Sequence, residues 1–289
     1  MTAVAGTGLA QTWRCRDRVF DLSSRTLVMG VVNVTPDSFS DGGRYLEPAA
    51  AIAQARRLLD EGADLLDLGA ESTRPGAQPV PAGEQLRRLE PVLAALAGED
   101  RACVSVDTAD ARVAERALEL GARVVNDVTA LRDPRMAAVA AEAGAGLVLM
   151  HLRGDPATMQ QDPRYEDVTR EVREHLAARL EAARQAGVAP EQVALDPGIG
   201  FGKTVRHNFE LLARLGELEA LGRPLVVGVS RKSFIGRTLD LPPDQRLEGG
   251  LAAAAVAVYL GARIVRTHDV AATVRAVRVA DALRGARRP

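Results

Sequence analysis

Short runs of β-branched and other apolar residues alternate along the chain with longer segments whose apolar residues recur at helical spacing. This alternation is typical of parallel strands connected by helices. The predicted strands are residues 26–32, 65–68, 103–106, 124–125, 146–150, 193–195, 224–229 and 264–265. Eight strand-helix units predict the α/β class and a single closed (β/α)8 barrel, known as a TIM barrel.

The segment before the first predicted strand, "TWRCRDRVFDLSSR", alternates like a hairpin and is expected to cover the barrel floor. We therefore divide the chain into an N-terminal extension with a hairpin, residues 1–25, and the barrel, residues 26–289. The segment "LAAAAVAVYLGA" (residues 251–262) is uniformly small and apolar. Because it is shorter than the ~20 residues of a membrane span, it predicts a helix packed against the barrel or against another subunit.

Composition and charge narrow the functional classes. With 289 residues, of which 47% are hydrophobic, the chain can bury a large core, and barrels of about 250 residues form single units. A net charge of −1 provides no general field for nucleic acid or anionic lipid. The chain begins without the features of a signal peptide, so we expect a cytoplasmic protein with small-molecule partners. Cys15 and Cys103 match no metal or redox spacing and are expected to be inert thiols.

Polar residues stand where each predicted strand ends. In barrels of this type, the loops after the strands build the active site. Any one of these residues could equally be a helix cap, whereas a polar residue at all eight ends favours a functional site. The residues are Asn33, Asp67 with Gly69, Asp107, Asn126 with Asp127, His151, Asp196, Ser230, and Arg266 with His268.

Residue types that are rare in this chain also occur in the loops that follow the predicted strands. The chain has 37 lysines and arginines together, of which only Lys203 and Lys232 are lysines, and both follow predicted strands. Since a compact ammonium and a planar guanidinium are not interchangeable, these two lysines are candidates for a specific role, although Lys203 could simply hold its loop. Asn33 and Asn126 are two of only three asparagines. Three phenylalanines also fall in these loops rather than in an obvious core: Phe39, Phe201 and Phe234.

Two loops are candidates for anion binding, and the prediction holds only for the second. "DPGIGFGKT" approaches the phosphate-binding pattern G-x-x-x-x-G-K-[ST], but Pro197 stands where the first glycine is required, so a nucleotide hydrolase is disfavoured. "GVSRKSFIG" gathers side-chain donors at a predicted helix start, where free backbone amides already favour an anionic group.

Taken together, the loops resemble the dihydropteroate synthase family. The matching segments occur in the family's order through nearly the whole chain: "MGVVNVTPDSFSDGG", "GAESTRPGA", "SVDT", "VNDV", "MHLRGDPATMQ", "DPGIGFGK", "GVSRKSFIG" and "VRTHDV". Departures are small: Ala70 replaces a glycine that many members have, and the wording after Asn126 varies.

The resemblance implies a transferase that joins p-aminobenzoate to 6-hydroxymethyl-7,8-dihydropterin diphosphate and releases diphosphate, and it implies a homodimer, for which residues 251–259 are a candidate contact. The implied pterin-binding residues are Asp107, Asn126, Met150, Asp196 and Lys232. The implied diphosphate-binding residues are Asn33, Thr73, Arg74, Arg266 and His268. The implied p-aminobenzoate-binding residues are Phe39, Pro75, Phe201, Lys232 and Ser233.

Within this set, the resemblance implies catalytic roles for Asp107, Lys232, Arg266 and His268, and Asn33 as the protein ligand of a Mg²⁺ cofactor. The chemistry is consistent with these roles. The amide and amino edge of a pterin donates two parallel hydrogen bonds, which suit the carboxylate of Asp196. Arg266 and His268 are two residues apart, as expected for one face of a strand. "TPDSFSDGG" and "STRPGA" are expected to be lids that exclude water.

Two other interpretations stay open at this point. A related pterin-binding barrel that transfers a methyl group would share Asp107, Asn126 and Asp196. It would not need the phosphate-binding set of Asn33, Arg266 and His268 or the "SRKS" helix start. The second is a degenerate barrel that binds pterin without catalysis; the intact loops argue against it, but only an assay settles the matter.

Overall fold

Eight parallel strands form the centre of the molecule in the computed structural model, which describes residues 12–34, 46–71, 78–155 and 158–286. The strands are β3 (Leu27–Asn33), β4 (Leu65–Gly69), β5 (Val104–Asp107), β6 (Val124–Asp127), β7 (Gly146–Met150), β8 (Val193–Asp196), β9 (Val226–Gly228) and β10 (Ile264–Thr267). Their order around the sheet is β8-β7-β6-β5-β4-β3-β10-β9. A parallel bridge between Leu195 and Leu225 joins the two ends, so the sheet closes into the predicted barrel.

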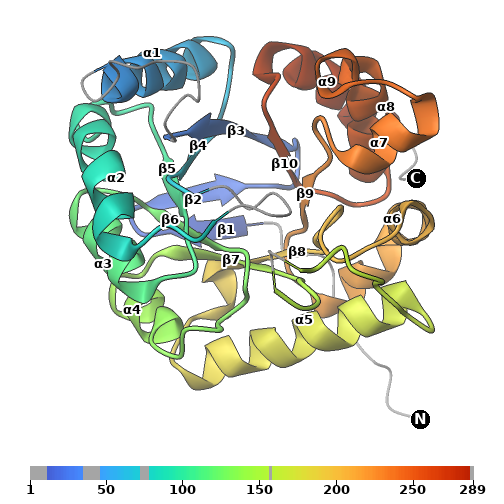
Figure 1. Cartoon of the computed structure of the whole chain (residues 1–289), viewed down its shortest axis with the longest axis horizontal. Coiled ribbons are helices and arrows are strands. Elements are labelled where there is room, and N and C mark those ends of the chain that lie inside the picture. Colours follow the sequence, from blue (N-terminus) through green and yellow to red (C-terminus); the bar gives the residue numbers. More distant parts are fainter. Residues whose placement is uncertain (1–11, 35–45, 72–77, 156–157, 287–289) are drawn as a thin grey trace.

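Helices surround the strands as an outer layer (Figure 1). They are α1 (Leu46–Asp60), α2 (Ala82–Leu96), α3 (Ala111–Glu119), α4 (Met136–Glu142), α5 (Val168–Gln185), α6 (Val205–Ala213), α7 (Ser233–Leu239), α8 (Leu247–Tyr259) and α9 (Val270–Ala286). Short 3₁₀ turns lie at Pro190–Gln192, Leu215–Leu221 and Pro243–Gln245. Polar side chains cap the starts of three helices: Asp110 accepts from the Arg112 amide at 2.9 Å, Asp167 from the Arg170 amide at 2.9 Å, and Thr204 from the His207 amide at 3.2 Å.

All eight predicted strands are present, but several of them end at other residues than predicted. Asp107, Asn126 and Asp196 belong to the strands rather than to the loops that follow. The prediction for residues 224–229 was too long, because β9 covers only Val226–Gly228. Pro224 has no backbone N–H to donate to a ladder, and Leu225 forms an isolated bridge to Leu195 while its carbonyl accepts from the amides of Arg263 and Ile264.

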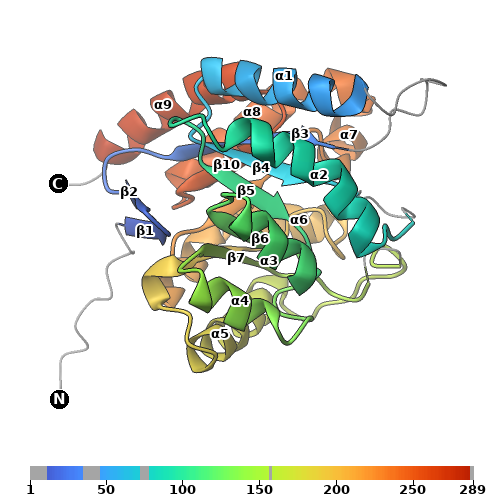
Figure 2. The same cartoon turned by 90° about the vertical axis from the view of Figure 1, so that its left-hand side faces the viewer.

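An antiparallel hairpin of β1 (Thr12–Cys15) and β2 (Arg18–Asp21) closes one end of the barrel (Figure 2). Trp13 is fully buried and donates from Nε1 to the Gln192 carbonyl at 2.8 Å. It packs with residues near the starts of the barrel strands, including Leu65, Val124 and Ile264. A Cβ on Gly146 would lie 2.6 Å from Cys15 Sγ, so the first position of β7 has no room for a side chain. The predicted cover of the barrel floor is confirmed.

Both cysteines lie in this floor cluster and are free. Burial raises the pKa of the Cys103 thiol to about 12, and burial also raises the pKa of Cys15. A thiol with such a pKa is not a nucleophile at neutral pH.

The small-residue segment forms most of α8, which packs along α9. Ala254, Ala257 and Val258 are buried, whereas Val256 and Tyr259 are exposed. In the part of the chain that the structure describes, no helix combines the length and the hydropathy needed to cross a membrane.

Candidate active site

Polar side chains from four strands meet at the carboxyl end of the barrel. Asp107 is the last residue of β5, Asn126 lies in β6, Asp196 is the last residue of β8, and Arg266 lies in β10. Asp107, Asn126 and Asp196 are between 5% and 8% exposed, so their polar groups face the interior of the barrel mouth. The predicted convergence of these residues is therefore present in the structure.

Asp67 in β4 organises this group. Its Oδ1 accepts from the Ser105 hydroxyl at 2.6 Å, and its Oδ2 accepts from Asn126 Nδ2 at 3.0 Å and from Arg266 Nε at 2.6 Å. Asp67 is completely buried. From the sequence, Asp67 was predicted only as a strand-end residue without a specific role. The available signal was a carboxylate in the middle of the apolar strand "LLDLG", because buried carboxylates need partners.

Arg266 links Asp67 to a second carboxylate, since its Nη2 donates to Asp107 Oδ2 at 2.8 Å. Burial raises the pKa of Asp107 to about 7; Arg266 opposes this rise and Asp67 adds to it. Burial alone would lower the pKa of Arg266, but Asp67 and Asp107 hold it above its ordinary value. The guanidinium is thus a fixed positive charge between two carboxylates.

Asp196 and Lys232 form the opposite side of the mouth. Asp196 Oδ1 accepts from the Gly198 amide at 2.7 Å, and burial raises the pKa of Asp196 while Lys232 opposes that rise. Burial lowers the pKa of Lys232 to about 8, against the attraction of Asp196 and with the help of Arg266. Lys232 Nζ donates to the Ile199 carbonyl and lies 4.5 Å from the centroid of the Phe201 ring.

Comparison with known proteins identifies the family of the chain. A family model described as pterin binding enzyme matches residues 29–268. Dihydropteroate synthase of Escherichia coli K12 is 46% identical over 255 residues, which cover 88% of this chain and 90% of that protein. The chain belongs to the dihydropteroate synthase family. The predictions of the family and of an enzyme are confirmed.

Two solved structures of family members have the same fold. Dihydropteroate synthase of Yersinia pestis in a sulfonamide drug complex superposes with a TM-score of 0.89 at 43% identity and covers 95% of this chain and 99% of its own. The enzyme of Xanthomonas albilineans in complex with 7,8-dihydropteroate gives a TM-score of 0.84 at 39% identity, with coverages of 95% and 98%. The predicted (β/α)8 barrel is confirmed.

In this dihydropteroate synthase family member, an apolar cluster lies beside the polar mouth. Met150, the last residue of β7, is buried with Val128, Leu152 and Met159, and Phe201 packs against them. Ser233 is the first residue of α7 and is exposed, so the predicted helix start at "SRKS" is correct. Asn33, the last residue of β3, is also exposed.

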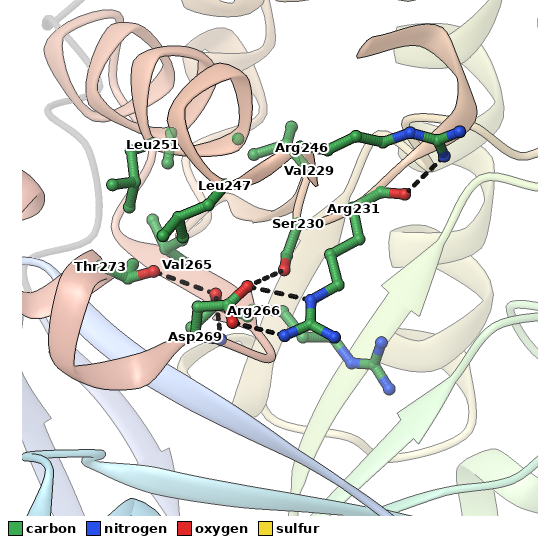
Figure 3. A pocket seen from close by; sticks show the side chains of 13 residues that line it. Val229, Ser230, Arg231, Arg246, Leu247, Leu251, Val265, Arg266, Asp269 and Thr273 are labelled. Atoms are coloured by element: carbon green, nitrogen blue, oxygen red, sulfur yellow. Dashed lines mark hydrogen bonds and ion pairs between the residues drawn. The ribbon is translucent and has the colours of Figure 1, made fainter. Parts of the chain in front are cut away.

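The ends of β9 and β10 meet at a small pocket beside α8 (Figure 3). Arg231 pairs with Asp269 at 2.5 Å, and its hydrogen bond lowers the pKa of Asp269. Ser230 Oγ lies 3.1 Å from His268 Nδ1 and 3.4 Å from Asp269 Oδ2. Arg266 contacts Asp67 and Asp107, whereas His268 contacts Ser230, so the two residues expected to act together have different partners.

Several residues that were singled out in the sequence are not placed in this site by the structure. Phe39, Thr73, Arg74 and Pro75 lie outside the described residues. The placement of Phe234 in a loop was wrong: it is 1% exposed in α7, where it meets the ring of Phe209 edge-on at 5.3 Å, because it faces the core. Asp127, one of the strand-end residues, is a cap that accepts from the amides of Thr129 and Leu131 at 2.8 and 2.6 Å.

Among residues 12–34, 46–71, 78–155 and 158–286, no three His, Cys, Asp or Glu side chains lie together as a group able to hold a metal ion.

Proposed function

We propose that the protein condenses 6-hydroxymethyl-7,8-dihydropterin diphosphate with p-aminobenzoate to give 7,8-dihydropteroate and diphosphate. The observation that carries this proposal is the carboxylate of Asp67, which holds the amide of Asn126 at 3.0 Å and the guanidinium of Arg266 at 2.6 Å. A hydrogen-bonding group suited to a flat heterocycle and a cation suited to a phosphate are thereby fixed relative to each other. Such preorganisation is what a substrate with both parts requires.

The pterin ring would lie between Asp107, Asn126 and Asp196, with Met150 against its face. Asp196 Oδ1 already accepts one bond from Gly198, but a carboxylate oxygen has a second lone pair, so the group can still receive the amide and amino edge of the ring. Lys232, whose pKa lies near 8, would donate to a ring acceptor. All of these side chains belong to strand ends or to the turns next to them, which keeps their geometry rigid.

The diphosphate would extend from the ring toward Arg266, His268 and Asn33, with Thr73 and Arg74 approaching from their loop. Asn33 fits the Mg²⁺ proposal because Mg²⁺ prefers hard oxygen donors, takes few of them from a protein and keeps phosphate oxygens and water as its other ligands. Bound there, Mg²⁺ would neutralise part of the charge on the leaving diphosphate.

The reaction would begin with cleavage of the carbon–oxygen bond, in which diphosphate leaves with the bonding electron pair. Arg266 stabilises the charge that develops on it, and the carboxylate of Asp107 faces the positive methylene of the dihydropterin. The amine of p-aminobenzoate then donates its lone pair to that carbon and loses a proton. Electrostatic stabilisation of this kind is usually the largest catalytic effect.

The second substrate would be held at the start of α7. Ser233 and Lys232 would bind the carboxylate of p-aminobenzoate, while Phe201, Phe39 and Pro75 would pack against its ring. The loops "TPDSFSDGG" and "STRPGA" would close over the site and exclude water, because hydrolysis is the competing fate of a reactive cation.

We also propose a homodimer formed through α8 and α9. Of the seven large hydrophobic side chains that are exposed among the described residues, four lie on these two helices: Val256, Tyr259, Val279 and Leu283. Exposed apolar side chains gathered in this way mark an association surface. Sedimentation of the purified chain, compared with a Val279→Glu variant, tests this proposal.

The function is tested with purified protein, both substrates and Mg²⁺. We expect diphosphate release that requires p-aminobenzoate, with formation of dihydropteroate in equal amount. Diphosphate release at the same rate without p-aminobenzoate would indicate a hydrolase, and pterin binding without any release would indicate a binding protein.

A further inference from the structure

The loop between β8 and α6 is held by side chains at every carbonyl from Gly198 to Gly202. Lys203 donates to Gly198 and Phe201, Lys232 to Ile199, Gln160 to Gly200, and Tyr165 to Gly202. The Gly198 carbonyl also accepts from the Phe201 amide at 3.1 Å, but among the described residues no strand or helix backbone pairs with these carbonyls, so the side-chain donors are the main support of the loop's shape. The only two lysines of the chain are both among them.

Lys203 is buried behind the loop at 3% exposure. Its Nζ lies 2.9 Å from the Gly198 carbonyl, 3.0 Å from the Phe201 carbonyl and 3.0 Å from His151 Nδ1. An ammonium has three N–H donors, and these three acceptors satisfy all of them. A guanidinium, which is planar and longer, cannot reproduce this convergence.

His151 follows β7 and is 4% exposed. Burial lowers the pKa of Lys203 to about 7, and Asp196 opposes this change. In its ammonium form Lys203 only donates, so His151 Nδ1 accepts, which places the ring proton on Nε2 and leaves the imidazole neutral. Burial and the nearby Lys203 lower the pKa of His151 to about 2, which agrees with a neutral ring. The loop also approaches β7 closely: a Cβ on Gly198, at φ +67°, would lie 1.9 Å from the His151 carbonyl.

We propose that Lys203 and His151 form a positioning pair for the pterin site. The pair acts through two short connections. Gly198, whose carbonyl receives Lys203, donates its amide to Asp196 at 2.7 Å. Phe201, whose carbonyl also receives Lys203, carries the ring that lies 4.5 Å from Lys232 Nζ. Lys203 is buried, so it acts through the backbone that orients both Asp196 and Lys232. This inference rests on the proposed function only for the identity of the ligand.

The decisive comparison uses two variants of His151. His151→Asn keeps an acceptor close to the position of Nδ1, because the Asn side-chain oxygen is also one bond beyond Cγ. His151→Phe keeps the ring and its volume but removes the acceptor. If His151 served only in packing, Phe would be the milder change. If it holds Lys203, Asn is the milder change, so the two roles predict opposite rankings.

Two measurements read the outcome. Hydrogen exchange of the peptide covering residues 196–204 reports the order of the loop without any need for activity. Calorimetric titration with 6-hydroxymethylpterin reports the pterin site. For His151→Phe and Lys203→Met, we expect faster exchange and about 10- to 100-fold weaker binding, the loss typical of a hydrogen bond to a charged group. His151→Asn should recover most of both losses.

The matched control is Tyr165→Phe, which keeps the ring but removes the donor to Gly202 at the far end of the loop. It should change pterin affinity by less than about threefold, since a neutral hydrogen bond contributes little net free energy. Should Lys203→Met fail to fold, the ranking of the two His151 variants still decides. Unchanged exchange and affinity in His151→Phe, or a worse result for Asn than for Phe, would overturn the pair. Failure of the wild-type protein to release diphosphate would instead count against the proposed function alone.

Discussion

The carboxylate of Asp67 lies 2.6 Å from Nε of Arg266, although the two residues are 199 positions apart in the chain. The contact joins β4 to β10 across the interior of the barrel mouth, with β3 between them in the sheet. Since Asp67 also holds Asn126 and Ser105, one buried carboxylate fixes three side chains from three other strands.

We predict that Asp67→Asn destabilises the protein by about 3 kcal/mol, because it removes one of the two carboxylates that pair with the guanidinium of Arg266 and leaves only Asp107. Urea unfolding measures the change. Ser105→Ala, which removes a neutral donor from the same carboxylate, is the matched control and should cost about 1 kcal/mol. Equal losses in the two variants would mean that Arg266 does not depend on Asp67.

The second prediction concerns Asp196, whose replacement by Asn should reduce pterin affinity by about 2 to 5 kcal/mol while affecting folding much less. An amide offers one acceptor where the pterin edge presents two donors, and its NH₂ would face a donor. Asp127→Asn is the control, because Asp127 is a buried carboxylate at the end of β6 that caps a turn. It should lower the melting temperature with little effect on affinity. Calorimetry showing wild-type pterin binding by Asp196→Asn would remove Asp196 from the site.

The barrel and most of the polar set could be predicted from the sequence, because strand ends converge in this fold whatever the intervening residues are. The pairings between side chains inside the barrel mouth could not be predicted. The sequence shows Asp67 as a polar residue at the end of a strand, but it does not identify Arg266 as its partner. Phe234 was misplaced for a related reason: its neighbours "SRKS" are polar, and only the observed start of α7 turns the ring toward the core. Lys203 was noticed through its rarity, but its acceptor His151 lies 52 positions away.

His268 should act on the diphosphate rather than on the pterin ring. We expect His268→Ala to weaken the binding of the intact substrate, while a pterin without diphosphate binds almost unchanged. Ser230→Ala should produce a smaller loss in the same direction, because Ser230 only orients the imidazole from 3.1 Å. Calorimetry with both ligands makes the comparison. Losses of similar size for the two ligands would place His268 at the ring and contradict the assignment.

The pH dependence of kcat/KM should be bell-shaped and narrow. Asp107 must be ionised to face the cation, so activity should rise as pH passes its pKa of about 7. Lys232 must be protonated to donate, so activity should fall as pH passes its pKa of about 8. Both limbs report the free enzyme. Steady-state rates measured from roughly pH 5 to pH 10 test this prediction. A flat profile across that range would show that neither Asp107 nor Lys232 titrates in it.

The stability linked to Asp107 has the opposite sign to that of an ordinary ion-paired carboxylate. Its pKa is raised in the folded state, from 3.8 to about 7, so the folded state binds more protons than the unfolded state in that window. The contribution is therefore present in acid and is lost as pH rises toward 7. Asp107→Asn should abolish this component, which urea unfolding at several pH values can measure against the wild type.

Lys232 should resist replacement by Arg even though arginine supplies nearly every other positive charge of the chain. The Lys232 side chain passes close to Gly200, since a Cβ on Gly200 would lie 2.9 Å from Lys232 Cδ. Its ammonium lies above the Phe201 ring. A wider, planar guanidinium would therefore be displaced from this position. A displacement of about 1 Å can cost on the order of a hundredfold in rate. Arg231→Lys is the control, because Arg231 is an exposed neighbour that pairs with Asp269, and such pairs contribute little. Turnover and thermal melts of both variants test the prediction. Near-normal turnover of Lys232→Arg would show that charge alone suffices, and the donor role would then have to be reassigned.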